Sequence, residues 1–458
     1  MKMTLEEVAK AVGAEADYSQ WQNNIVTSVT FDSRQLQPGG LFVPLVAQRD
    51  GHDFIESAIQ NGAVGSFWQK GHAHAPVDFP LIEVADTQAA FEQLAKYYLH
   101  KVNPRVIAIT GSNGKTTTKD MIAAVLATQS NTCKTRANYN NEIGVPYTIL
   151  SMDTNTENLV LEMGMDRPGQ LHKMSLLAEP DIAVITMIGE AHIEFFGTRA
   201  KIADAKMEII DGLKADGTLV FDGDEPLLRE RVPEEVQTRT FGQHEIDDIS
   251  AQAVVAEKKQ TTFVASPWPE VQFSVPLMGA YNVMNALAAI AVGDLIHVPS
   301  KQMAGALAEF KLTAERTEWV KAANGADLLS DVYNSNPTAV KEVLKNFTAI
   351  QTNGHRIIVL GDMLELGAQS AELHASLAES IQPQQIQTVF LIGKDMQALY
   401  HALQDRYSEH QLHYYSLADK ALLTVDLKDA IQPDDMVLLK ASHGLHLEDV
   451  VAELQASN

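Results

Sequence analysis

The sequence predicts an α/β protein of three domains, and three features support this prediction. At 458 residues the chain is too long for one ordinary domain. Strand-like apolar runs alternate with helical patterns along most of its length, which favours mainly parallel sheets with helices on both faces. A glycine-rich turn joins one of these strands directly to a helix. We therefore expect domains at residues 1–103, 104–312 and 313–458.

The first 103 residues mix short strands and helices, so we expect a small mixed α/β domain there. Its first segment, MKMTLEEVAKAVGAEA, has the pattern of an amphipathic helix and lacks the basic start, apolar run and cleavage site of a secretory signal. No stretch of the chain has the uninterrupted apolar length of a transmembrane helix. These features predict a cytoplasmic protein without membrane insertion.

The central domain follows the turn signal Asn103-Pro104 and shows the clearest alternation. We expect strands at RVIAIT, NLVLEMG and DIAVITMIG, each followed by a helical pattern. Short alternating strands are expected between about Ser250 and Val275, and the next helix at YNVMNALAAIAV. This order predicts a parallel sheet of the mononucleotide-binding, phosphate-loop type.

The last domain contains a second α/β series after Leu312. Its strand-like segments are LLSDVYN, RIIVLGDM, TVFLIGK and DMVLLKAS, and PTAVKEVLKNF has a helical pattern. This alternation predicts an open, doubly wound, Rossmann-like sheet, whose ligands bind at the carboxyl ends of the strands.

Charge and cysteine content exclude several classes of function. A formal charge of -24 argues against nucleic-acid binding, which needs a positive surface. The single cysteine, Cys133, excludes an intramolecular disulfide framework and a cysteine-based zinc cluster. Any anionic ligand must therefore be held by local hydrogen-bond donors. Separately from charge and cysteine content, we expect a monomer with small-molecule partners.

A phosphate-binding loop is the strongest single signal in the chain. Its glycines let consecutive N–H groups point at phosphate oxygens, and the following helix presents its positive end to the same anion. Lys115 supplies a positive charge for the β and γ phosphates, and the hydroxyl of Thr116 can join a Mg²⁺ shell. A plain GTPase or kinase is less expected, because the usual spacing would place a glycine at Ile109. The alternative is a tight turn whose glycines serve geometry alone. The predicted loop consists of Gly111, Ser112, Asn113, Gly114, Lys115, Thr116 and Thr117.

Two residues at strand ends are candidates for a metal site. Glu162 ends the strand NLVLEMG, and His192 follows the strand DIAVITMIG. The carboxyl ends of parallel strands meet in one crevice, and a carboxylate and an imidazole are suitable ligands for a divalent ion that bridges phosphates. Each residue taken singly is more often a surface or packing residue.

Lys206 is a third candidate, because it lies on the apolar stripe of its helix with Ile202, Ile209 and Ile210. A desolvated lysine has a lowered pKa and a nucleophilic neutral amine, which can take up carbon dioxide as a carbamate. The alternative is that the stem packs and the ammonium reaches water, which periodicity alone favours.

Several separated segments together resemble the Mur ligases, a family of ATP-dependent amide-bond ligases. In chain order they are TGSNGKTTT, NYNNEIGVP, VLEMGM, AHIEFFG, IADAKMEI, GAYNVMNALAA and DVYNSNPTAV. Within the family they are similar to the members that add D-alanyl-D-alanine to a UDP-N-acetylmuramoyl tripeptide, a step of cell-wall peptidoglycan synthesis. The resemblance implies ATP and two Mg²⁺ ions as cofactors. It also implies transfer of the γ-phosphoryl group to the tripeptide carboxylate before the dipeptide amine attacks.

The resemblance also assigns residues to the nucleotide and the metal ions. It implies that the loop with Lys115 binds the phosphates and that Thr116, Glu162, His192 and a carbamylated Lys206 hold metal. Further nucleotide contacts are implied for Asn282, Asn285, Arg316 and Asp331. Read without the resemblance, the asparagines suit helix capping and the last two an ordinary surface pair.

The remaining assignments concern the muramoyl substrate. The implied contacts lie in the segment FDSRQ, in the asparagine-rich loop and in YNSNP, and alone these segments would pass for turns and loops. The residues are Asp32, Ser33, Arg34, Asn138, Asn140, Asn141, Asn334 and Asn336.

Three positions depart from the family pattern. Members commonly carry KGSR near the end, whereas this chain has Lys440, Ala441, Ser442 and His443 and so lacks the arginine. Met187 and Asp222 stand where asparagine is common.

Two other classes of function stay open on the sequence. A sister ligase, such as one that adds the third residue or a folate polyglutamate ligase, would share the loop, but third-residue-adding members usually carry a DNP signature where YNSNP stands here. A regulatory ATP-binding module would use domain closure, not ligation, as its output.

Overall fold

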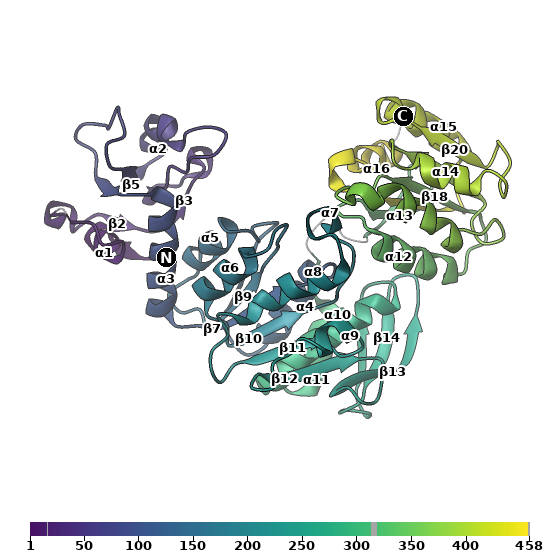
Figure 1. Ribbon diagram of the computed structural model, residues 1–458, viewed down its shortest axis with the longest axis horizontal. Coiled ribbons are helices and arrows are strands. Elements are labelled where there is room, and N and C mark those ends of the chain that lie inside the picture. The colour runs from purple at the N-terminus through teal and green to yellow at the C-terminus, as the bar shows by residue number, and fades with distance from the viewer. Residues whose placement is uncertain (16, 313–317, 457–458) are drawn as a thin grey trace. The chain divides into compact units, whose positions relative to one another are not determined.

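The computed structural model describes residues 1–15, 17–312 and 318–456, and it confirms the predicted α/β class (Figure 1). The described residues form two compact units. The first unit contains 1–110, 126–184 and 208–219, and the second contains 111–125, 185–207 and 220–458 apart from the residues that are not described. The three predicted domain boundaries stay predictions.

The N-terminal part of the first unit is built on a four-stranded sheet of order β3-β4-β5-β6, in which every pair is parallel. Leu36, Phe42, Ile55, Ala58 and Trp68 form a buried core against it. Strands β1 and β2 make a separate antiparallel pair. The strands are β1 (Met3–Thr4), β2 (Ile25–Val26), β3 (Ser28–Thr30), β4 (Gly40–Phe42), β5 (Ala63–Gln69) and β6 (Leu81–Val84), and the helices are α1 (Leu5–Ala11), η1 (Ser19–Trp21), η2 (Ser33–Gln35), η3 (Gly51–Phe54), α2 (Ile55–Gln60) and α3 (Thr87–Val102).

The first helix starts later than its sequence pattern predicts. Thr4 caps α1, because its Oγ1 accepts a hydrogen bond from the Glu7 N–H at 3.1 Å. Met3 and Thr4 pair with Val26 and Ile25 as strand β1, so they are withdrawn from the helix.

The central sheet has nine strands in the order β15-β14-β13-β12-β11-β10-β7-β9-β8. Its strands are β7 (Arg105–Thr110), β8 (Thr132–Lys134), β9 (Asn158–Glu162), β10 (Ile182–Ile185), β11 (Thr218–Asp222), β12 (Gln237–Gly242), β13 (Ile249–Ala256), β14 (Thr261–Ala265) and β15 (Gln272–Val275). The associated helices are α4 (Lys115–Leu126), α5 (Gly144–Leu150), α6 (Gln170–Ala178), α7 (Ile193–Phe196), α8 (Arg199–Met207), η4 (Glu208–Ile210), α9 (Pro226–Arg229), α10 (Ala280–Leu295) and α11 (Ser300–Glu309). The predicted strands β7, β9 and β10, the short strands β13 to β15 and the helix α10 are confirmed.

The C-terminal sheet has six strands in the order β16-β17-β21-β18-β19-β20, and all pairs are parallel except β16 with β17. Alternate strand residues such as Ile357, Val359 and Leu439 pack against Leu423 of α15 and Val450 of α16. The opposite face is left to the other helices, which gives the predicted doubly wound arrangement. The strands are β16 (Glu318–Lys321), β17 (Asp327–Asp331), β18 (Arg356–Gly361), β19 (Thr388–Ile392), β20 (Leu412–Tyr415) and β21 (Met436–Lys440), and the helices are α12 (Pro337–Ala349), η5 (Gly367–Gln369), α13 (Ser370–Ala375), η6 (Ser376–Ser380), α14 (Gln397–Leu403), η7 (Leu417–Asp419), α15 (Lys420–Ala430), η8 (His443–Leu445) and α16 (Glu448–Gln455). Among the described residues, no helix is long and apolar enough to span a membrane.

Candidate functional site

The predicted phosphate loop lies between β7 and α4, and the segment after β10 holds its backbone in place. The Ser112 N–H donates to the Met187 carbonyl at 3.0 Å, and the Thr186 hydroxyl donates to the Asn113 carbonyl at 2.5 Å. Gly111 has φ 152°, and a Cβ there would lie 1.8 Å from Thr186 Oγ1. Only glycine therefore permits this approach of the loop to the neighbouring strand end.

The second loop glycine makes room for a side chain of α10. Gly114 has φ 81°, and a Cβ on it would lie 2.3 Å from Asn285 Oδ1. That oxygen accepts from the Thr118 hydroxyl at 3.2 Å, and Asn285 Nδ2 donates to Asn282 Oδ1 at 3.1 Å. Both asparagines are buried and brace the loop from behind. Their predicted contact with adenine stays a prediction.

Two lysines of the predicted site stand close enough to influence each other. Lys115 begins α4 and folds back so that Nζ donates to the Gly111 carbonyl at 2.8 Å. Lys206 lies in α8 with a relative exposure of 2%. Burial lowers the pKa of Lys206 well below its usual value, and the charge of Lys115 lowers it further. The structure therefore contradicts the alternative in which the Lys206 ammonium reaches water.

The His192 imidazole pairs with a carboxylate that the sequence did not indicate. Its Nδ1 lies 2.5 Å from Glu365 Oε2, and this pairing holds the pKa of Glu365 below its usual range. His192 itself has φ 64° and directly precedes α7. An imidazole held by a carboxylate through one nitrogen presents its other nitrogen in a fixed direction, the usual arrangement of a metal-binding histidine. Glu365 gave no local signal, because it lies in a loop far along the chain.

Glu162 occupies the carboxyl end of β9 in the first unit. It is 1% exposed and lies opposite Ile109 in the parallel β7–β9 pair, two residues before the phosphate loop begins. Asn140 Nδ2 donates to Glu162 Oε1 at 2.8 Å. The structure thus joins a predicted substrate residue to a predicted metal ligand.

The other asparagines of this loop have different surroundings. Asn141 Oδ1 accepts from the N–H groups of Ile143 and Gly144 at 3.2 and 2.8 Å, so it initiates α5. The Asn138 side chain is exposed. The predicted loop conformation of this stretch is confirmed, and the substrate contacts stay predictions.

The segment from Asp32 to Arg34 forms a turn whose charges satisfy each other. Asp32 accepts from the Arg34 N–H at 3.0 Å and forms two 2.9 Å hydrogen bonds with its guanidinium. This pairing lowers the pKa of Asp32. Ser33 is buried, and its carbonyl accepts from Asn61. The Arg34 side chain remains 85% exposed, so it can still meet a ligand.

In the C-terminal sheet, Asp331 neutralises a buried lysine. Lys440 Nζ lies 2.5 Å from Asp331 Oδ2 and donates to the Asn334 carbonyl at 2.8 Å. Lys440, the first residue of the segment that replaces the family's KGSR, therefore contacts two predicted site residues, Asp331 and Asn334. His443 lies against the Tyr333 ring with centroids 5.4 Å apart. Arg316 lies outside the described residues.

Asn336 connects this sheet edge with the phosphate loop. Its Oδ1 accepts from the Ala339 N–H at 3.0 Å and so caps α12. The amide groups of Asn336 and Asn113 also form two hydrogen bonds with each other, at 2.8 and 3.2 Å. Glu190, which sequence analysis did not single out, accepts from the Thr338 hydroxyl at 2.7 Å. Its position two residues before His192 was the available signal.

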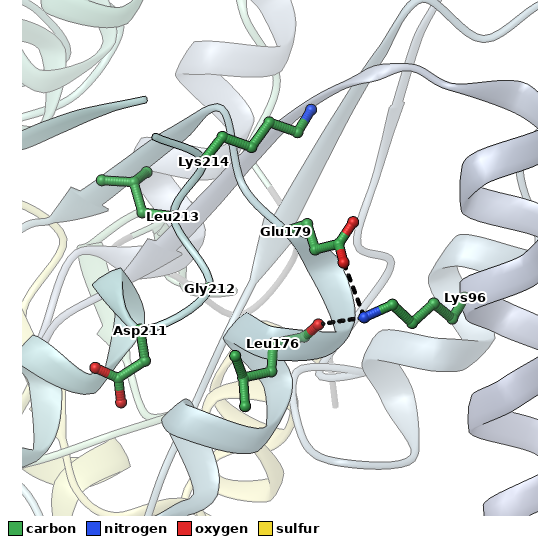
Figure 2. A pocket seen from close by; sticks show the side chains of 7 residues that line it. All are labelled: Lys96, Leu176, Glu179, Asp211, Gly212, Leu213 and Lys214. Atoms are coloured by element: carbon green, nitrogen blue, oxygen red, sulfur yellow. Dashed lines mark hydrogen bonds and ion pairs between the residues drawn. The ribbon is translucent and has the colours of Figure 1, made fainter. Parts of the chain in front are cut away.

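A surface pocket of about 480 Å³ in the first unit has a different character. Lys96 lies 2.8 Å from Glu179 and donates to the Leu176 carbonyl, as Figure 2 shows. Lys214 pairs with Asp181 at 2.8 Å. Because these charges already have protein partners, the pocket has the character of a solvated surface, not of an anion site.

Two family models match the chain. The Mur ligase middle domain matches residues 109–293, and the Mur ligase, glutamate ligase domain matches residues 315–443. The chain is 40% identical over 460 residues to the UDP-N-acetylmuramoyl-tripeptide--D-alanyl-D-alanine ligase of Bacillus subtilis, covering 99% of this chain and 98% of the relative. Its fold is similar to a crystal structure of MurF from Acinetobacter baumannii, with a TM-score of 0.87, 27% identity and 99% of both chains covered. It is also similar to the Thermotoga maritima MurF ligase in complex with ADP, with a TM-score of 0.81, 28% identity and 94% and 97% of the two chains covered.

Proposed function

The chain belongs to the Mur ligase family, and we propose that it joins D-alanyl-D-alanine to UDP-N-acetylmuramoyl-tripeptide in an ATP-dependent reaction. The product is the UDP-muramoyl-pentapeptide precursor of peptidoglycan. The observation that carries the proposal is the 40% identity to the B. subtilis ligase across the whole chain, with the phosphate loop, His192 and buried Lys206 in the matched middle domain.

The reaction consists of a phosphoryl transfer followed by an acyl transfer. A carboxylate oxygen of the tripeptide forms a bond to the γ-phosphorus as the bond to ADP breaks, which gives an acyl phosphate. The dipeptide amine then attacks the acyl carbon, a C–N bond forms, inorganic phosphate leaves, and the nitrogen loses a proton. The first step is needed because a free carboxylate is a poor electrophile.

The phosphate loop supplies the positioning for the first step. Its backbone is fixed by the Ser112 N–H bond to the Met187 carbonyl and by the Thr186 hydroxyl bond to the Asn113 carbonyl, and α4 presents its N-terminus to an anion bound there. Lys115, now held by the Gly111 carbonyl, is the mobile charge for the transferring phosphoryl group. The ADP bound to the T. maritima relative supports the choice of nucleotide.

On the family resemblance, we assign two Mg²⁺ ions to four residues. Thr116, Glu162 and His192 offer a hydroxyl, a carboxylate and an imidazole held by Glu365, and Lys206 would contribute as a carbamate. Mg²⁺ held by these residues would neutralise charge on the phosphoryl oxygens. The lowered pKa of Lys206 favours the neutral amine that carbon dioxide needs, since a carbamate converts a buried cation into a metal-binding anion. A monomeric state and a cytoplasmic location are further parts of the proposal.

A substrate matrix tests this function. Purified, Mg²⁺-supplied protein is incubated with ATP and each pair of an acceptor, UDP-muramoyl dipeptide or tripeptide, and a donor, single amino acids or D-alanyl-D-alanine. We expect phosphate release and a new amide product, by mass spectrometry, with the tripeptide and D-alanyl-D-alanine together. Ligation of a single amino acid to the dipeptide would reassign the chain to a sister ligase. Phosphate release without either substrate would favour a non-ligating ATP-binding module.

The same assay tests the phosphate loop. We expect Lys115→Ala to abolish turnover while the fold is retained, because the loop backbone is held by other residues. Full activity in this variant would remove the loop from the active site.

A further inference from the structure

Three carboxylates gather where β11 ends and where β12 turns towards β13. Asp222 is the last residue of β11, Asp224 follows it, and Asp247 lies in the loop before β13. The Asp247 side chain is 0% exposed and that of Asp224 is 18% exposed. None of the three belongs to the proposed ligase site.

One oxygen of this cluster is buried without a hydrogen bond. Asp247 Oδ1 accepts from Arg229 at 2.7 Å, but Asp247 Oδ2 has no hydrogen-bond partner among the residues that the structure describes. A Cβ on Gly242 would lie 2.1 Å from this oxygen and 2.9 Å from Asp224 Oδ2. The two carboxylates therefore face one small space, which the missing side chain of Gly242 keeps open. A buried, unsatisfied carboxylate oxygen is costly unless a ligand or a proton meets it.

The charges around this space are poorly balanced. Arg229 is the cation that binds Asp247 in the described part of the chain, and its guanidinium also contacts the Gly223 carbonyl. Glu225 adds negative charge but is paired with Arg199 at 2.7 Å. Asp222 at the end of β11 adds a further carboxylate. Carboxylates therefore outnumber the arginines that pair with them.

An imidazole completes a set of three donors. His244 Nδ1 faces Asp224 Oδ1, and one ligand atom from each of Asp224, His244 and Asp247 lies within 4.8 Å of the others. We propose that Asp224, His244 and Asp247 bind a divalent cation of the Zn²⁺ or Mn²⁺ class, because two carboxylates and one imidazole suit these ions. Such an ion would link the turn after β11 to the loop between β12 and β13.

A second cluster, of one aspartate and two histidines, shows why the oxygen of Asp247 without a hydrogen bond matters. Asp50, His52 and His72 also bring ligand atoms within 4.8 Å of one another. There His52 uses its nitrogens for Asp50 and the Gln69 N–H, and His72 uses its nitrogens for Asp50 and the Ala73 carbonyl. These hydrogen bonds satisfy the cluster without an ion, whereas Asp247 remains unsatisfied.

Metal titration of the full-length, metal-stripped protein without nucleotide tests the proposal. Mn²⁺ binding is followed by the paramagnetic resonance of free Mn²⁺, and Zn²⁺ binding by calorimetry. We expect Asp247→Asn to bind one equivalent fewer than the wild type. Glu245→Gln is the matched control, because it removes a carboxylate from the same loop at an exposed position, and it should keep the equivalent. His244→Ala should weaken Zn²⁺ at this site by at least roughly tenfold, the scale of losing even an outer-shell partner.

Metal binding by two further variants provides independent tests of the site. His192→Ala should retain this equivalent, and its loss there would move the ion to the ligase site and overturn the proposal. Asp224→Asn should lose the equivalent as Asp247→Asn does, which provides a second variant if one folds poorly. Equal metal binding by the wild type and both Asp variants would refute the site. A rise in the metal-free unfolding midpoint of Asp247→Asn, with no response of the wild type to either metal, would show a shared proton instead.

Discussion

Two buried lysines of the second unit have the same exposure and opposite surroundings. Lys206 in α8 and Lys440 at the end of β21 are each 2% exposed. Lys440 is met by the Asp331 carboxylate and the Asn334 carbonyl. The Lys206 ammonium forms no hydrogen bond or ion pair with any residue that the structure describes, and the charge of Lys115 opposes it.

The difference shows that burial alone does not prepare an amine for chemistry. A buried ammonium with a carboxylate partner remains a cation and a structural element. One without a partner is driven towards the neutral form, which is the reactive one. Removing each lysine or its partner tests this distinction.

The largest effect is expected from removing the unpartnered amine. Lys206→Ala should lower ligase turnover by roughly 10³-fold, the scale of losing one preorganised charge-stabilising group. Any loss of stability should come from the side-chain packing that is removed, because no ion pair is lost. Steady-state phosphate release and thermal unfolding measure both, with the exposed Lys201→Ala of the same helix as control. Near-normal turnover of Lys206→Ala would show that its burial has no catalytic purpose.

The partnered lysine should show the opposite balance. Asp331→Asn leaves the Lys440 ammonium buried without its counter-charge and should cost about 3 kcal/mol of unfolding free energy, measured by urea titration. The double change Lys440→Met with Asp331→Leu should recover most of this loss, because no charge then remains buried. A loss below about 0.5 kcal/mol in Asp331→Asn would mean that the pair behaves as a surface ion pair.

A smaller effect concerns carbon dioxide. If Lys206 acts as a carbamate, wild-type turnover should fall several-fold in buffer stripped of carbon dioxide and return when bicarbonate is added. Lys206→Ala should respond to neither treatment. Wild-type turnover that is independent of bicarbonate, with no carbamate carbon signal in a ¹³C spectrum, would leave Lys206 as a plain amine.

The smallest effect is expected at the Asp50–His72 ion pair, which is more exposed than the Asp331–Lys440 pair. Hydrogen bonds from His52 and His72 lower the pKa of Asp50 to about 2, so its contribution to stability is present above its ordinary 3.8 and is lost as pH falls towards 2. Hydrogen bonds to Asp50 and Ala73 raise the pKa of His72, so its contribution is present below 6.5 and is lost as pH rises through the raised value. Asp50→Asn should therefore destabilise most at about pH 5 and less at about pH 8 in urea titrations. A pH-independent difference would remove the ionic contribution.

Local patterns were sufficient for the elements that carry the site. The run RVIAIT and the following glycines predicted β7, the loop and α4, because hydrophobic period and glycine placement are local properties. The apolar neighbours of Lys206 placed it on the buried stripe, but periodicity could not decide whether its ammonium reached water. That depends on packing around α8, which only the tertiary structure shows.

Contacts between distant segments could not be predicted. The partner of His192 is Glu365, and the partners of Lys440 are Asp331 and Asn334, all from other parts of the chain. The asparagine-rich loop was correctly expected to be irregular, yet nothing local indicated that Asn140 would hold Glu162. Side-chain partnership of this kind depends on strand order and register, which the sequence pattern leaves open.

The two hydrogen bonds between the Asn113 and Asn336 side-chain amides couple the phosphate loop to the start of α12. Asn336 Oδ1 accepts hydrogen bonds from both Asn113 Nδ2 and the Ala339 N–H that it caps in α12. A phosphate that drew Asn113 away would leave this oxygen with one donor fewer. We therefore expect the first turn of α12 to respond when nucleotide fills a loop more than two hundred residues earlier in the chain. Its backbone amide resonance should shift when nucleotide arrives, before any bond is made or broken.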